Sequence, residues 1–431
     1  HMPMLEPSSV QECKDFVISA FEISEKLKVP VILRVTTRSC YAKGTVELGK
    51  IKKAKKIEVS IEKFKEAAWN NMPPKIVEVH KNLHEKLKLA ENISEKFCKI
   101  EGDEREIGII VSGIPYLYVK EVFEDEELKG KAQILKIGMW PYPKNKIKNF
   151  LLGKKKVLVI EEIEGILEEE IKKIAYEENL KVEILGKNIL PSYGELKIND
   201  VEAAIRKVLE LKKKKYKERL DVIPRRPVLC PGCPHRATFY EIKKVFGNAI
   251  YCGDVGCYIL GMFRPLETQG FIISMGASEG IAHGIKKVRD DYVISFVGDS
   301  TFFHAGIPGL INIVYNQNYN VKNNPLVVIM NNKATAMTGH QPHPGVGITG
   351  MGNKVNEIKI EEISKFCNTT KIDPFNYKES LEKIKKVKDL LEKEPQVIIS
   401  EKECRLQFMR RARREGIRVP TFYINKEKCK K

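Results

Sequence analysis

The sequence lacks the features that mark exported, membrane-spanning and zinc-finger chains. None of its apolar runs approaches the roughly 18 residues that a membrane helix needs, and its first residues do not resemble a signal peptide. Its 431 residues contain a single Cys-x-x-Cys pair, Cys230 and Cys233, and no zinc-finger pattern. We therefore expect a cytoplasmic protein with no membrane partner.

Charge of one sign is in excess, with 75 Lys and Arg residues against 57 Asp and Glu residues and a formal net charge of +18. The basic runs 52–56, 154–156, 212–215 and 410–414 mostly stand beside Glu-rich helical segments, and aromatic residues are not interleaved with them. Mixed Lys, Glu and Ile usage is typical of thermophile surfaces. We expect no nucleic-acid partner and instead favour an acidic protein, which a positive face would attract.

The composition itself indicates a globular chain. Hydrophobic residues make up 42% and charged residues 31%, which excludes a disordered or collagen-like chain and favours an α/β fold. At roughly 100–200 residues per domain, the length predicts about three domains.

The first half of the chain divides into four segments. Residues 1–44, with a helical pattern at 10–26 and a strand pattern at 31–37, cannot bury a core alone, so we interpret them as the tail of an α/β domain. Residues 45–104 are charged and mostly helical, which indicates a connector. Residues 105–195 alternate near-continuous apolar strands with helices, which predicts a doubly wound parallel sheet. We interpret residues 196–225 as a basic linker that is helical over residues 200–219.

The last domain, residues 226–425, contains nearly all the residues that point to chemistry. Asp299 follows the expected strand 292–297, and Asn332 follows the next expected strand, 326–330. Ligands of a parallel sheet bind beyond the carboxyl ends of its strands, so the two side chains are expected to face one site. Carboxylate and amide oxygens, with a backbone carbonyl and phosphates, form the oxygen shell that Mg²⁺ prefers.

Cysteines and histidines also concentrate in this domain. Ten cysteines in a chain without an export signal are expected to be reduced thiols or ligands, and four of them lie within residues 230–257. Five of the eight histidines lie between residues 235 and 343. Because an imidazole can move protons near neutral pH, we consider His304, His340 and His343 as candidate catalytic groups.

These motifs together resemble a known family. A Gly-Asp after one strand and an Asn-Asn after the next, about thirty residues later, are similar to the thiamine-diphosphate-binding motif. The surrounding segments CPGCPHR, GDVGCY, MGAS, GDSTFFHAGIPGLIN and NNKATAMTGHQPHPG resemble the large subunit of indolepyruvate:ferredoxin oxidoreductases. Residues 105–195 resemble the transketolase C-terminal-like domain of that family, and residues 1–44 resemble the end of its pyrimidine-binding domain.

The resemblance implies a role for each motif residue. Asp299 and Asn332 would hold Mg²⁺ through side-chain oxygens, and Ala334 through its backbone carbonyl. Gly298 and Ser300 would shape the diphosphate turn, although Ser300 replaces the glycine that is usual in the broader motif. The remaining implied cofactor-binding residues are His235, Met337 and Thr338.

Four cysteines occupy places that resemble the ligands of an iron–sulfur cluster in related pyruvate oxidoreductases. They are Cys230, Cys233, Cys257 and Cys404. Four thiolates suit a [4Fe–4S] cluster and also tetrahedral zinc. A cluster, a zinc ion and unliganded thiols beside the cofactor pocket all remain open.

The family's activity is the oxidative decarboxylation of an aryl 2-oxoacid, with coenzyme A taking the acyl group and ferredoxin taking the electrons. The resemblance implies thiamine diphosphate, Mg²⁺, a smaller partner subunit and a hetero-oligomer. Two other functions remain open: a non-catalytic scaffold subunit, and a thiamine-dependent decarboxylase or synthase without redox chemistry.

The chain departs from the family at both ends. By this resemblance we expect most of the pyrimidine-binding domain, with its activating glutamate, to be missing from this sequence, and we interpret residues 426–431 as the start of a ferredoxin-like region. We therefore expect weak or no turnover from this chain alone.

Overall fold

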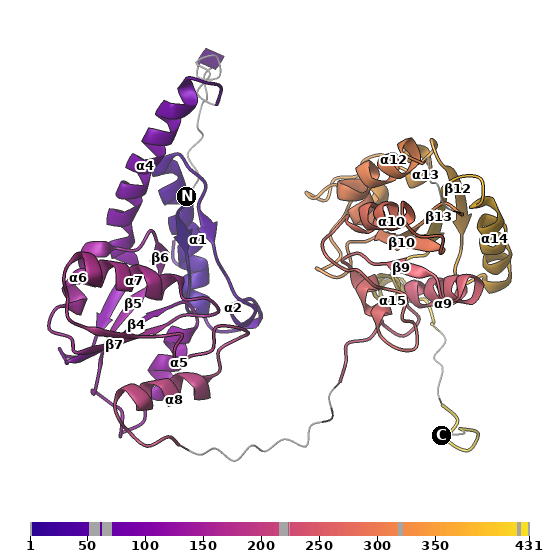
Figure 1. Cartoon of the computed structure of the whole chain (residues 1–431). Coiled ribbons are helices and arrows are strands. Elements are labelled where there is room, and N and C mark those ends of the chain that lie inside the picture. The colour runs from indigo at the N-terminus through magenta and orange to yellow at the C-terminus, as the bar shows by residue number, and fades with distance from the viewer. Residues whose placement is uncertain are drawn as a thin grey trace. The chain divides into compact units, whose positions relative to one another are not determined.

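The computed structural model describes residues 2–50, 61–62, 71–214, 223, 225–317, 322–419 and 424–429. It divides the chain into two compact units, His1–Leu220 and Asp221–Lys431 (Figure 1). Parts of the expected connector 45–104, of the expected linker 196–225, of the domain 226–425 and of the segment 426–431 lie outside the described residues. No helix in the described ranges is long and apolar enough to cross a membrane.

The first unit is built on a five-stranded sheet of order β3-β5-β4-β7-β8. The apolar segments IGIIVS and KVLVI form the central strands, and alternate residues are buried on opposite faces, as expected of a covered parallel sheet. The strands are β3 Cys98–Glu101, which is antiparallel, and the parallel β4 Ile107–Ser112, β5 Gln133–Ile137, β7 Lys156–Ile160 and β8 Glu183–Leu185.

Helices cover both faces of this sheet (Figure 1). The pair α5 Pro115–Val122 and α8 Ile198–Val208 shares one core with the strands. The pair α6 Lys144–Leu151 and α7 Ile166–Glu177 shares the core on the other face. The predicted doubly wound arrangement is therefore present in this unit.

The segment 196–225 differs from the expected linker. Residues Ile198–Val208 form α8, whose Val201, Ile205 and Val208 are buried in the core. These apolar residues recur at the spacing of one helix face. The lysines that follow at 212–214 dominate the local composition and hide this pattern.

The N-terminal segment also packs against the first unit. A three-stranded sheet, order β2-β1-β6, joins β1 Met4–Leu5, β2 Ile32–Leu33 and β6 Met139–Trp140. Helices α1 Val10–Leu27 and α4 Lys75–Ser94 bury Phe16, Ile23 and Ala90 in one cluster with Met139, and the 3-10 turn Glu95–Phe97 follows α4. The expected strand 31–37 ends early because a short helix, α2 Thr37–Tyr41, begins after Thr36, whose backbone N–H donates to the hydroxyl of Ser39 at 2.8 Å.

The second unit contains a five-stranded sheet that is parallel throughout, of order β12-β13-β11-β10-β9. The expected strands 292–297 and 326–330 are confirmed as β10 Val293–Gly298 and β11 Leu326–Asn331, and β13 Gln396–Glu401 pairs with β11. Two edge strands were not expected, because β9 Ile250–Cys252 is short and β12 Asn368–Ile372 is polar.

Helices again cover two faces (Figure 1). One face carries α9 Pro234–Phe246 and α14 Tyr377–Leu390. The other carries α10 Ser278–Lys286, α12 Ile307–Tyr315 and α13 Ile360–Ile363. The α/β class with doubly wound parallel sheets is thus confirmed.

The connections that follow the strands of the second unit contain the remaining short elements. After β10 the chain continues as a helical turn, α11 Asp299–Thr301, and a π-helical segment, Phe302–Gly306, before α12. The 3-10 turns Cys257–Met262 and Pro344–Val346 follow β9 and β11. Helix α15 Arg405–Arg414 follows β13.

Candidate functional site

A pocket of about 90 Å³ lies beyond the carboxyl ends of β10 and β11. The register pairs Gly298 with Met330, so the segments that leave the two strands emerge side by side. This edge is where parallel sheets bind ligands. All eight residues expected at the cofactor line the pocket: His235, Gly298, Asp299, Ser300, Asn332, Ala334, Met337 and Thr338.

Asp299 joins the ends of the two strands. Its side chain is buried, and its carboxylate accepts the backbone N–H of Ser300 at 2.7 Å and that of Asn332 at 3.0 Å. Ser300 belongs to the helical turn Asp299–Thr301 and is not among the residues with positive φ, so the glycine usual there is not required. The carboxylate is thereby held at the pocket wall.

Asn332 is held by contacts at both ends of its amide. Its side-chain oxygen accepts the N–H of Ala334 at 3.1 Å, and its side-chain nitrogen lies 3.1 Å from Nε2 of His235. Burial lowers the pKa of His235 to about 4, and the nearby Asp299 opposes this only in part. The imidazole is therefore neutral, and we assign its proton to Nδ1 because Nε2 accepts from Asn332.

Gly298 is required by a close approach. A Cβ atom at this position would lie 2.6 Å from the ring of Tyr258. The Tyr258 hydroxyl donates to the backbone oxygen of Val255 at 3.0 Å, and its ring packs edge-on against His235. Any side chain at 298 would displace the aromatic wall of the pocket.

The oxygens at this pocket fit a small divalent cation. Asp299 supplies a carboxylate, Asn332 a side-chain oxygen, and Ala334 a backbone carbonyl in the same turn. Each carboxylate or amide oxygen has two lone pairs. An oxygen that accepts one of the hydrogen bonds described above therefore keeps a second lone pair that a metal ion can use. Hard oxygen donors with phosphate oxygens are what Mg²⁺ prefers.

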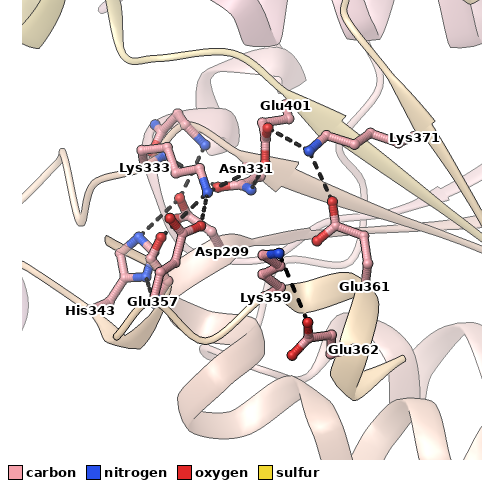
Figure 2. Close-up of polar contacts among 12 residues, drawn as sticks. Asp299, Asn331, Lys333, His343, Glu357, Lys359, Glu361, Glu362, Lys371 and Glu401 are labelled. Atoms are coloured by element: carbon pink, nitrogen blue, oxygen red, sulfur yellow. Dashed lines mark hydrogen bonds and ion pairs between the residues drawn. The ribbon is translucent and has the colours of Figure 1, made fainter. Parts of the chain in front are cut away.

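The turn formed by residues 332–334 carries two of the expected metal ligands, Asn332 and Ala334, and we call it the metal turn. His343 lies behind this turn and does not line the pocket. Its Nδ1 accepts the N–H of Gly345 at 3.2 Å, and its Nε2 lies 3.1 Å from a carboxylate oxygen of Asp299. The contact between Nε2 and Asp299 is a close approach and not a hydrogen bond. Figure 2 shows this contact.

Lys333 lies between the expected metal ligands Asn332 and Ala334 and anchors the metal turn. Lys333 has a φ of 59° and forms ion pairs with Glu357 and Glu401, at the end of β13 (Figure 2). Asn331 donates to Glu401 at 2.7 Å, and Lys371 pairs with the same carboxylate. These residues form a polar ladder, Asn331, Lys333, Glu357, Lys371 and Glu401, that holds the metal turn against the sheet.

Asp254 organises the opposite wall of the pocket and was missed by sequence reasoning. It is fully buried, and it accepts the N–H groups of Val255 at 2.6 Å and Gly276 at 2.8 Å. Burial raises its pKa, and these hydrogen bonds oppose the rise. Gly253-Asp254, between Cys252 and Cys257, is the same dipeptide as Gly298-Asp299. This likeness is the sequence signal that could have identified Asp254.

The four expected cysteines come together in the second unit. The charges of Cys230, Cys257 and Cys404 act on Cys233, whose pKa burial raises to about 12. Burial likewise raises the pKa of Cys257 to about 11. Among the described residues, no three His, Cys, Asp or Glu side chains are already arranged to hold a metal ion. The four thiols lie close enough for their charges to interact, and Cys257 also lines the pocket.

The other candidate histidines lie apart from the pocket lining. His304 is exposed on the π-helical segment. His340 is half-buried; its Nε2 lies 3.6 Å from Sγ of Cys404, and its Nδ1 lies 3.3 Å from the guanidinium of Arg410. The structure therefore brings His340 to the cysteines and His343 to Asp299, and leaves His304 outside both groups.

Residues 254–400 match the family described as thiamine pyrophosphate enzyme, C-terminal TPP binding domain. With the fold and the pocket, this match defines a thiamine pyrophosphate-binding enzyme domain.

Relatives identify the family more closely. Indolepyruvate oxidoreductase subunit IorA of Pyrococcus horikoshii is 37% identical over 100% of this chain and 70% of its own length. The subunit IorA of Archaeoglobus fulgidus is 37% identical over 99% of this chain and 69% of its own length. The chain belongs to the family of indolepyruvate oxidoreductase subunit IorA.

A solved 2-oxoglutarate:ferredoxin oxidoreductase from Magnetococcus marinus is also similar. The alignment covers 44% of this chain and 70% of that chain, with 19% sequence identity and a TM-score of 0.34. A likeness at this level carries no argument about the activity.

Proposed function

We propose that this chain holds the diphosphate and the Mg²⁺ of thiamine diphosphate in an enzyme that oxidatively decarboxylates an aryl 2-oxoacid such as indolepyruvate. The observation that carries the proposal is the pocket at the ends of β10 and β11, where Asp299 and Asn332 lie in hydrogen-bond contact. The aryl substrate is supported by the names of the relatives, which are indolepyruvate oxidoreductase subunits.

Asp299, Asn332 and the carbonyl of Ala334 would hold Mg²⁺, and Gly298 and Ser300 would close around the diphosphate. The bound cofactor supplies the electron sink that allows a 2-oxoacid to lose CO₂. His235, as a neutral imidazole, keeps the side chain of Asn332 oriented. Met337 and Thr338, both exposed at the pocket, would border the reacting end of the cofactor.

The histidines would act at different places. His343 would orient the carboxylate of Asp299, which its Nε2 faces. His340 and His304 are proposed as proton-transfer groups for bound substrate, with His340 the better placed because it lies in the loop that follows the metal turn.

The neighbouring thiols of Cys230, Cys233, Cys257 and Cys404 are proposed to bind a [4Fe–4S] cluster, with zinc as the alternative. An anaerobic ultraviolet–visible spectrum with iron and zinc analysis tests this. Broad brown absorption with about four irons per chain is expected, and a colourless protein containing neither metal contradicts it. In the complete enzyme, electrons would pass to ferredoxin, the acyl group to coenzyme A, and a smaller subunit would complete the hetero-oligomer.

A thermal shift experiment tests the cofactor site itself. Thiamine diphosphate with Mg²⁺ is expected to raise the melting temperature, because a ligand that binds only the folded form stabilises it. Asp299→Ala should abolish the shift. Asp389→Ala, at an exposed position of α14, is the matched control and should retain it. No shift in the wild type, or one that survives Asp299→Ala, would sink the proposal.

Activity distinguishes the three functions. The chain is assembled with its smaller subunit, and CO₂ release from indolepyruvate is measured with and without coenzyme A and an electron acceptor. Release that requires both supports the oxidoreductase. Release without an acceptor indicates a non-redox decarboxylase, and cofactor binding without release from any 2-oxoacid indicates a scaffold.

A further inference from the structure

An arginine-rich segment begins at the cofactor pocket. The chain is lysine-rich and has sixteen arginines, yet six of them lie within residues 405–418, with only two glutamates in 403–418. A lysine-rich surface of the kind that thermophile proteins have does not explain why arginine replaces lysine in this segment. Arginine differs from lysine because its planar guanidinium binds carboxylates through two parallel hydrogen bonds.

Among the residues that the structure describes, most of this charge is not neutralised. Arg410, Arg413, Arg414 and Arg418 are exposed and have no ion pair in the described ranges. Arg411 is different, because Glu403 and Glu415 pair with it at 2.8 and 3.1 Å. The end of α15 and the residues after it therefore present a net positive surface, which we call the α15 surface: Arg410, Arg413, Arg414 and Arg418.

The α15 surface is connected to the metal turn by direct contacts. The N–H of Cys404, which precedes α15, donates to the backbone oxygen of Asn332 at 2.9 Å. His340 contacts both Sγ of Cys404 and the guanidinium of Arg410, and its N–H donates to Thr335, which lines the pocket. Since α15 has ten residues, its far end is only about 15 Å from Cys404.

We propose that the α15 surface is the docking site for an acidic, one-electron-carrying protein that takes electrons from the site beside it. This inference rests on the proposed oxidoreductase function. The partner is a protein rather than a nucleotide because the arginines spread along an exposed helix rather than converge on one phosphate-sized position. Positive charge there would speed the encounter with acidic carboxylates and orient the carrier toward Cys404.

The test uses the assembled holoenzyme with its smaller subunit and two electron acceptors, methyl viologen and an acidic ferredoxin. The variant Arg413→Glu/Arg414→Glu reverses two exposed charges that contact neither the pocket nor the cysteines. The matched control, Lys385→Glu/Lys386→Glu, makes the same charge change at two exposed residues of α14.

At low ionic strength, the arginine variant should raise the KM for ferredoxin by about tenfold or more and lose its salt dependence. Its methyl viologen rate should be unchanged, and the lysine variant should match the wild type with both acceptors. Ferredoxin binding, measured by titration calorimetry without substrate, should weaken by a similar factor, which is a readout independent of turnover.

Two results would overturn the docking site. One is an unchanged ferredoxin affinity in the arginine variant. The other is an equal loss in the lysine variant, which would mean that only overall charge matters. Loss of RNA binding with unchanged ferredoxin affinity would assign the surface to nucleic acid instead. A wild-type enzyme that fails to reduce methyl viologen contradicts the proposed function, and ferredoxin calorimetry then decides the docking site separately.

Discussion

Single residues around the pocket act mainly by holding other residues in position. Asp299 keeps the ends of two strands together, Asp254 holds the opposite wall, and Lys333 fixes the turn between the expected metal ligands. Each does so through charge-assisted contacts in buried or half-buried surroundings, where such contacts are stronger than in water. Changing these residues should therefore alter cofactor binding more than folding.

Lys333 provides the first test. Replacing it with Met removes the ion pairs with Glu357 and Glu401 that hold its left-handed backbone. We expect the affinity for thiamine diphosphate with Mg²⁺ to fall about fivefold, since a partly exposed pair contributes up to about 1 kcal/mol, and Lys333→Arg to restore most of it. Titration calorimetry measures this. Lys359→Met, which removes only the contact with Glu362 (Figure 2), is the control, and equal affinities in the two Met variants would refute the expectation.

Glu279 gives a prediction about pH. It is fully buried at the start of α10, and burial raises its pKa from 4.5 to about 8. Between these values the folded chain holds a proton that the unfolded chain releases. The free energy of unfolding should therefore decrease as the pH rises from 4.5 to about 8, by at most about 1.4 kcal/mol per pH unit from this group.

The variant Glu279→Gln resembles the protonated form at every pH. We expect it to match the wild type near pH 5 and to be more stable than the wild type near pH 8, in denaturant unfolding at a series of pH values. Glu382→Gln, at an exposed position of α14, should leave the pH dependence unchanged. A Glu279→Gln variant with the wild-type slope would show that this carboxyl is not the source.

At the scale of elements, α8 shows how composition can conceal packing. The helix lies in a basic segment, yet Val201, Ala204, Ile205 and Val208 close the core of the first sheet. Arg206 is also buried and forms ion pairs with Asp125, Glu127 and Glu202. The helix is therefore an integral part of the first unit.

Substitutions in α8 test this placement. Ile205→Ala should lower the free energy of unfolding by about 2–5 kcal/mol, because it leaves a cavity in a closed core. Lys207→Ala, at the neighbouring exposed position, should change it by less than about 0.5 kcal/mol. Chemical denaturation followed by circular dichroism is sufficient. Similar small effects for both would mean that the segment behaves as a linker.

At the scale of the whole molecule, the chain consists of two compact units, each with its own cores. Only Asp221–Lys431 contains the pocket at Asp299. We therefore expect each unit to have its own source of stability, and we expect only Asp221–Lys431 to respond to the cofactor.

Scanning calorimetry should show two unfolding transitions. Thiamine diphosphate with Mg²⁺ should raise the melting temperature of only one transition. The free energy of unfolding of that unit should increase by about 2.7 kcal/mol when the ligand is present at about a hundred times its Kd. Ile205→Ala should lower the melting temperature of only the other transition. A single transition that responds to both changes would show that the two units unfold together.

Much of this protein was predictable from local sequence. Short apolar strands that alternate with helices imply a parallel sheet, and a parallel sheet places the residues after consecutive strands at one edge. Asp299 and Asn332 therefore met as expected, although they lie 33 residues apart. Strand β12 was not predicted because it is polar, and the buried face of α8 was not predicted because the neighbouring lysines outweighed its periodicity.

The remaining features depend on contacts between distant segments. Lys333 meets Glu401 because the register of β11 and β13 pairs Asn331 with Glu401, and Cys404 reaches Asn332 for the same reason. No local pattern encodes a register between strands that lie some seventy residues apart. The resemblance predicted the metal ligands, whereas the polar ladder that holds the metal turn and the arginine-rich helix α15 that begins beside it follow from packing in three dimensions.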